Sequence, residues 1–160
     1  MTNFDEKDPK SVADFALKNL KRHDLFTLAT IDEEGKPWVV CLNLCIDEIG
    51  NVIWKSRTST NHSTHVGKNP SVAICVFSKS KEYGDFGFYA KATAHEVNNR
   101  DELSKHLKVR YEQRGEKVPS VNEFLGDAAV KVYYAEITEA WINDDRHIKT
   151  QIDLRELRGQ

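Results

Sequence analysis

A short polar segment in the first half of the chain carries the residues best suited to bind an anion. The apolar run Val52–Trp54 leads to Lys55 and Arg57, which lie two residues apart and so share one face of an extended strand. Hydroxyl side chains follow, and then His62 near the start of a short helical turn. Fixed cations, hydroxyl donors and the backbone N–H groups of a helix N-terminus bind phosphate in proteins. The segment predicts a phosphate site; the alternative is a solvated loop at the rim of the fold.

Histidine and cysteine, the residue types that most often bind zinc, form no ligand set in this sequence. His62 and His65 could share one helical face, but no carboxylate or cysteine near them completes a site, so we predict no metal. The three cysteines include no C-x-x-C pair, and their odd number is typical of a reducing cytoplasm. Cys41 and Cys45 lie four apart in an apolar run, so we expect both on one strand face as small buried side chains.

Several function classes are disfavoured by composition and by missing motifs. The net charge of −2 gives no reason to expect nucleic-acid binding. No apolar run approaches the roughly 18 residues that cross a membrane, and the acidic, polar N-terminus differs from a signal peptide, so we expect a cytoplasmic protein. The GxSxG, GxGxxG and Walker-type loops of hydrolases and nucleotide-binding enzymes do not occur. No residue stands out as a general acid or base, so catalytic residues stay unassigned.

Hydrophobic periodicity and turn residues divide the chain into strands with few helices. The expected elements are a helix over 9–22, strands over 25–31, 38–46, 51–57, 71–78, 86–97 and 129–142, a short helical turn before Pro70, a helical insert over 99–126, and an unassigned tail over 143–160. Both alternating residue sets of the strand 38–46 are largely apolar, so we expect both of its faces to be covered.

The order of these elements predicts the architecture. Six strands at hairpin spacing, with helices only near the start and late in the chain, argue against βαβ units. A mainly β fold with flanking helices follows, built as a six-stranded antiparallel barrel that is closed or partly closed, because closure removes exposed strand edges. The length of 160 residues suits a single domain over 1–160.

Three segments together resemble the FMN-binding split barrels of the pyridoxamine 5′-phosphate oxidase-like family. Residues 28–40, with Gly35-Lys36-Pro37-Trp38, look like the opening hairpin of that family, and especially of its general-stress and nitroimidazole-resistance branch. Residues 53–73 look like its strand, phosphate loop, short helix and following "N-P-x-V" strand. Residues 87–97, paired with 133–141, are similar to its later strands. The resemblance covers about residues 10–142, and the order and spacing of the motifs carry it.

The resemblance implies a homodimer with FMN at the interface, and it implies which residues bind the cofactor. Lys55, Ser56 and Arg57 are expected along the flavin ring edge and the ribityl phosphate. Thr60, Asn61 and His62 fall at the family's phosphate contacts. Val40, Cys41 and Asn43 lie on the strand that backs the isoalloxazine ring, and Trp141 is expected to reach the partner's flavin. Family members often carry Lys or Arg where His62 stands, so phosphate affinity is expected to be lower or sensitive to pH.

The implied function is flavin chemistry on a small substrate. We expect a flavin-dependent oxidoreductase that takes electrons from a small substrate or a reduced nicotinamide. The tail lacks the Arg-containing ending that pyridoxamine-phosphate oxidases use for substrate, so we do not expect that activity. The alternatives are a non-catalytic flavin-binding stress or electron-transfer module, the same barrel holding a deazaflavin or haem, and an empty dimeric barrel.

Overall fold

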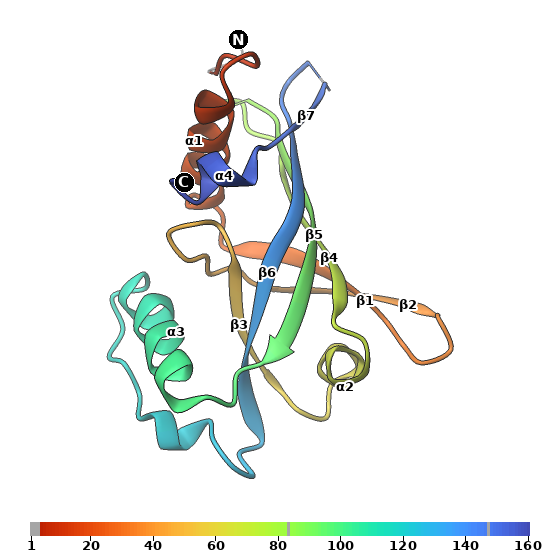
Figure 1. Ribbon diagram of the computed structural model, residues 1–160, viewed down its shortest axis with the longest axis vertical. Helices are drawn as coiled ribbons and strands as arrows, with labels where there is room; N and C mark the ends of the chain where they lie inside the picture. Colours follow the sequence, from red (N-terminus) through yellow and green to blue (C-terminus); the bar gives the residue numbers. More distant parts are fainter. Residues whose placement is uncertain (1–3, 83, 147) are drawn as a thin grey trace.

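The computed structural model describes residues 4–82, 84–146 and 148–160, and Figure 1 gives the arrangement of the elements. The helices are α1 (Pro9–Leu20), α2 (Asn61–Lys68), α3 (Arg100–Glu112), the 3₁₀ turn Val121–Glu123, and α4 (Leu154–Leu157). The strands are β1 (Leu25–Ile31), β2 (Pro37–Asn43), β3 (Val52–Arg57), β4 (Ser71–Ser78), β5 (Phe86–Glu96), β6 (Val130–Asn143) and β7 (Lys149–Gln151).

All the strands belong to one antiparallel sheet that curls without closing. The order is β2-β1-β4-β5-β6-β3, and the short β7 adds to the side of β6. Between the ends of this order, the sheet is bridged only by the isolated pair Ile46 and Val52, as far as the described residues go. This open, curled sheet confirms the predicted mainly β split barrel, and the seventh strand comes from the tail that the sequence left unassigned.

The helices begin where the sequence provides capping groups. The Asp8 side chain accepts a hydrogen bond from the Lys10 backbone N–H, and Pro9 occupies the first turn of α1. Asn99 caps α3 by accepting from the backbone N–H groups of Asp101 and Glu102. α1 lies within the predicted helix 9–22, and α3 and the 3₁₀ turn lie within the predicted insert 99–126.

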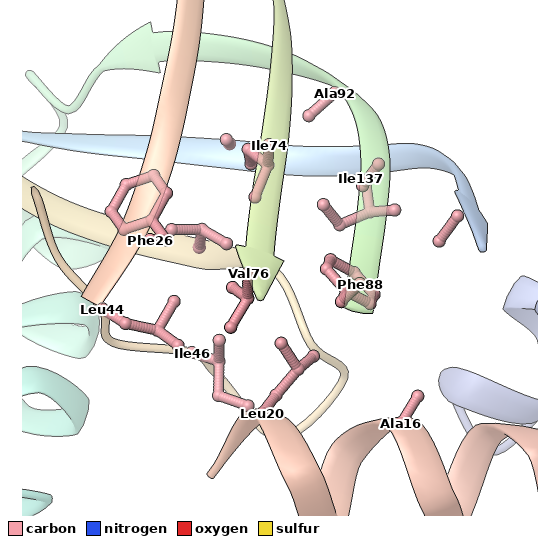
Figure 2. Packing of buried hydrophobic residues seen from close by; sticks show 14 of the residues in the cluster. Ala16, Leu20, Phe26, Leu44, Ile46, Ile74, Val76, Phe88, Ala92 and Ile137 are labelled. Atoms are coloured by element: carbon pink, nitrogen blue, oxygen red, sulfur yellow. The ribbon is translucent and has the colours of Figure 1, made fainter. Parts of the chain in front are cut away.

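Two hydrophobic clusters lie on opposite faces of β3, and they decide where its polar end points. The larger cluster fills the barrel and includes Trp54 from β3. Figure 2 shows its side chains converging from the strands and from α1, so the interior is packed with protein. The smaller cluster places Ile53 against Leu103 and Leu107 of α3. Because strand residues alternate, Ser56 continues the barrel face, whereas Lys55 and Arg57 continue the α3 face.

The predicted strand over 38–46 is wrong in two respects. It ends at Asn43, because the following backbone changes partner: Leu44 donates to the Asp24 carbonyl, and Ile53 donates to the Cys45 carbonyl. Its outer face is also left uncovered by the described residues, with Val39 61% exposed. Cys41 is exposed and Cys45 is buried, so the two cysteines are not both buried on one strand face as expected.

The C-terminal tail completes the side of the barrel that α1 covers. After β7, the chain forms α4, which packs against α1 (Figure 1). The turn before β3 fits beneath both helices, because a side chain at Gly50 would approach Leu17 of α1 at 3.3 Å and Leu157 of α4 at 3.2 Å. Within the described ranges, no helix has the length and apolar character needed to cross a membrane.

Gly50 and Gly35 provide a matched test of this packing. Both have positive φ, +83° and +79°, but only Gly50 has neighbours within 4 Å of an added Cβ. We expect Gly35→Ala to lower the free energy of unfolding by about 1 kcal/mol, the strain of a left-handed alanine. Gly50→Ala should cost about 2 kcal/mol, because α1 and α4 must also shift. Urea unfolding of both variants measures the difference, and equal losses would contradict the tight packing of Gly50 against α1 and α4.

Candidate functional site

A cluster of hydroxyl groups around one imidazole lies where β3 ends and α2 begins. The Ser56 Oγ lies 2.6 Å from the His62 Nε2, and the Thr60 Oγ1 lies 3.2 Å from the same nitrogen. Thr60 Oγ1 also lies 2.9 Å from the Ser63 Oγ. Ser56 belongs to the barrel face of β3, and the other three residues come from the tight connection to α2 and its first turn. The structure therefore brings together the predicted residues Ser56, Thr60 and His62.

The N-terminus of α2 adds backbone donors to this cluster. Thr60 is the N-cap residue, but its side chain makes no capping hydrogen bond to the helix and instead contacts the Arg57 carbonyl at 2.9 Å. The first-turn N–H groups of Asn61 and His62 thus lack a side-chain cap, and a helix N-terminus carries a partial positive charge. This donor set suits an anionic group such as a phosphate.

His62 is buried, and burial sets its protonation. The residue is 5% exposed. Burial lowers the pKa of His62 below its ordinary value, and the neighbouring His65 acts in the same direction. His62 is therefore neutral near pH 7, unlike a lysine at this position. His65 fixes the helix on the sheet, because its Nδ1 is hydrogen-bonded to the Thr30 Oγ1 at 2.9 Å.

A second group of polar residues lies on the same barrel face and was missed by the sequence analysis. Lys131 is directly opposite Ser56 across the β3–β6 pair, and it donates to the Gly126 carbonyl at 2.6 Å. Its Nζ lies 3.8 Å from the Glu96 Oε1. The Tyr133 hydroxyl donates to the other Glu96 oxygen at 3.4 Å. The only signal in the sequence was a lysine among the apolar residues that begin β6.

Trp54 supplies an orphaned donor next to these groups. Its indole Nε1 is buried and has no hydrogen-bond partner in the part of the chain that the structure describes. Trp54 precedes Ser56 by two residues on the barrel face, and its ring stacks on Tyr133 with centroids 5.5 Å apart. Buried polar atoms are rarely left unpaired. The Trp54 Nε1–H is therefore available to donate to an acceptor at this end of the barrel.

Lys55 and Arg57 lie on the opposite face of β3 from this cluster. The Lys55 Nζ donates to the Tyr111 hydroxyl at 2.9 Å and lies 5.3 Å from the centre of its ring. Tyr111 belongs to α3, so the helical insert holds Lys55 on its own side. Arg57 is exposed at the end of β3. The structure therefore separates the two predicted cations from the predicted hydroxyl and imidazole contacts within one chain.

The remaining predicted residues lie on β2 and β6. Val40 is half-buried and packs against the barrel core, whereas Cys41 and Asn43 are exposed on the outer face. Trp141 lies near the end of β6 that is remote from Lys131, so one chain does not bring it to His62. It does share the outer face with Cys41, because the register runs from Cys41 through Thr27, Cys75 and Tyr89 to Trp141.

This outer face is apolar and uncovered. Leu25 is 54% exposed and Phe77 is 56% exposed, and both lie beside the row just described. Lysines flank its aromatic end, with the Lys149 Nζ 4.8 Å from the centre of the Tyr89 ring and the Lys91 Nζ 5.7 Å from that of Trp141. A contiguous apolar face of this kind is typical of a protein contact surface.

The burial of His62 leads to a prediction on pH. The unfolded chain has an ordinary histidine pKa of about 6.5, and the folded pKa is lower, so the unfolded state binds the proton first as pH falls. The His62 contribution to stability is present above about pH 6.5 and is lost as pH falls toward its folded pKa. NMR titration should show the lowered pKa, and His62→Gln should reduce the loss of unfolding free energy between neutral and mildly acidic pH. A normal or raised pKa would contradict this placement.

Comparisons with known proteins place this fold in a family. The family model for pyridoxamine 5′-phosphate oxidase matches residues 13–144. No curated protein matches the sequence.

Solved structures agree on the fold. A haem-binding protein from Mycobacterium smegmatis is 12% identical, with 99% of this chain and 62% of that chain covered and a TM-score of 0.72. HutZ, the haem storage protein from Vibrio cholerae, is 17% identical, with 82% and 94% covered and a TM-score of 0.64. A candidate 5-nitroimidazole antibiotic resistance protein from Bacteroides thetaiotaomicron is 14% identical, with 81% of each chain covered and a TM-score of 0.65.

At these identities the solved structures show the fold alone, whereas the family model spans most of the sequence. It includes β1 to β6, α2 and the hydroxyl–imidazole cluster. The resemblance seen in the sequence is confirmed: this chain belongs to the pyridoxamine 5′-phosphate oxidase family and has its split-barrel fold.

Proposed function

We propose that this chain binds FMN as a homodimer and acts as a flavin-dependent oxidoreductase on a small substrate or a reduced nicotinamide. The observation that carries the proposal is the cluster of Ser56, Thr60 and His62 at the uncapped start of α2, in a chain of this family. These side chains, with the N–H of Asn61, would hold the phosphate. Val40 would border the ring, and bound FMN would supply hydride or electron transfer.

The charge of His62 in this phosphate site would depend on whether the phosphate is bound. Neutral His62 offers one N–H donor and no charge. A phosphate dianion nearby favours the imidazolium, so His62 would take up a proton as the anion binds. The protonated ring could then donate from Nε2, the atom that contacts Ser56 at 2.6 Å. Arg57 would act from the other face of β3, toward a part of the ligand outside this cluster, whereas Lys55 stays bonded to Tyr111.

The outer sheet face supports a homodimer. Val39, Leu25 and Phe77 are the kind of exposed apolar side chains that a second copy would cover. Cys41, Asn43 and Trp141 lie on this face and would then be at the seam between subunits. That position agrees with the expectation that Trp141 reaches the partner's flavin.

The first test is whether the phosphate cluster retains FMN. Purified protein should be yellow, with a flavin absorbance spectrum and the mass of a dimer by light scattering. Ser56→Ala with Thr60→Val should weaken FMN binding by about ten-fold or more, because two contacts to a charged group are lost. The matched control is Lys55→Gln, on the opposite face, which should retain most of the flavin. Equal flavin loss from both variants would contradict the assignment of the phosphate to the Ser56 side.

Turnover separates the oxidoreductase from a non-catalytic flavin-binding module. Under anaerobic conditions, NADH or NADPH should bleach the bound flavin absorbance if the protein accepts electrons from nicotinamide. Readmitted oxygen should restore the spectrum, and protein without the nicotinamide serves as the control. No bleaching by either nicotinamide would leave the small-substrate or the non-catalytic alternative.

Haem is a second candidate because two of the similar structures are haem proteins by name, and α2 carries His62 and His65. The geometry opposes His62 as an iron ligand, since its Nε2 is hydrogen-bonded to Ser56 and the residue is 5% exposed. A Soret band in place of a flavin spectrum would favour haem. A deazaflavin would be recognised by its shorter absorption wavelength.

A further inference from the structure

The proposed phosphate site lacks a permanent positive charge in its own loop. His62 is neutral near pH 7 in the free protein, because burial lowers its pKa. Lys55 is held by Tyr111 on the opposite face of β3, and Arg57 lies on that same opposite face. Phosphate sites in proteins usually include a lysine or arginine that offsets the ligand's charge. A charge from another part of the chain is therefore expected.

Lys131 is the buried lysine of the described residues, and it lies on the correct face. It is directly opposite Ser56 in the β3–β6 register, so the two side chains point to the same side of the sheet. The backbone links the two segments again two residues further on, where the Thr58 N–H donates to the Ala129 carbonyl at 3.1 Å. Figure 1 shows the end of β3, the end of β5 and the start of β6 at one end of the barrel.

The Glu96 carboxylate offsets the positive charge of the Lys131 ammonium only in part. Its partner Glu96 is 3.8 Å away, and the side chains are 6% exposed for Lys131 and 31% exposed for Glu96. Water screens the carboxylate more than the ammonium, because a buried charge is screened less than an exposed one. The other buried cation in the described residues, Arg110, lies on the α3 side, 3.5 Å from the Ile53 carbonyl.

We propose that Lys131 supplies the permanent positive charge for the phosphate of a flavin mononucleotide held at the start of α2. The Glu96 carboxylate partly offsets that charge. This inference rests on the proposed function and assigns a specificity-determining role to a residue outside the phosphate loop. Lys131 acts on the phosphorylated end of the ligand, so it should set the preference for FMN over riboflavin. It should have little effect on affinity for the unphosphorylated flavin.

Two variants isolate this charge. Glu96→Gln keeps Lys131 and removes the opposing carboxylate. The double variant Glu96→Gln with Lys131→Met removes both charges, so the two variants differ only at position 131. The readout is the ratio of riboflavin to FMN dissociation constants, measured by flavin fluorescence on apoprotein, with thermal unfolding as the check on folding.

We expect Glu96→Gln to raise the preference for FMN about three-fold, and the double variant to lower it about ten-fold below that of Glu96→Gln, with riboflavin affinity unchanged. Equal ratios in the two folded variants, or equal losses for both flavins, would overturn the inference and leave Lys131 a structural residue. Where the double variant does not fold, Glu96→Gln alone provides the test. A higher ratio of riboflavin to FMN dissociation constants than in the wild type supports the role of Lys131, and an equal or lower ratio overturns it. Wild-type protein that binds neither flavin overturns the proposed function itself.

Discussion

The alternation of side chains along β3 is the constraint on which the candidate site depends. Trp54 is fixed in the barrel core and Ile53 is fixed against α3, so a slip of one residue would move each side chain to the wrong cluster. Ser56 must then face the barrel side, where His62 and Lys131 meet it. Two separate hydrophobic clusters thereby decide which polar residues can act together.

The parts of the fold set by local patterns could be predicted from the sequence. Pro9 marks the start of α1 and Asn99 that of α3, and alternating apolar runs mark the main strands. The exception is the strand over 38–46, whose apolar pattern continues past Asn43 while its backbone leaves β1. The apolar pattern indicates side chains that tend to be buried, but it does not reveal that the other described residues leave the outer face uncovered.

The candidate site was predictable only where its members are neighbours in the chain. Ser56, Thr60 and His62 meet across one tight connection, so the polar segment and its resemblance to the family together indicated them. Lys131, Glu96 and Tyr133 come from strands whose pairing no local pattern specifies. Lys55 was grouped with the phosphate residues because of its charge, and its contact with Tyr111 depends on the docking of α3, a tertiary event.

The uncovered outer sheet also has a consequence for how such a protein is handled. A surface with Val39 and Phe77 mostly exposed is stable in water chiefly when something covers it. Where the cover is a second copy that also borders the ligand, association and ligand retention become thermodynamically linked, and each strengthens the other by mass action. Dilution would then release ligand from an otherwise intact subunit, so occupancy would depend on protein concentration as well as on ligand concentration.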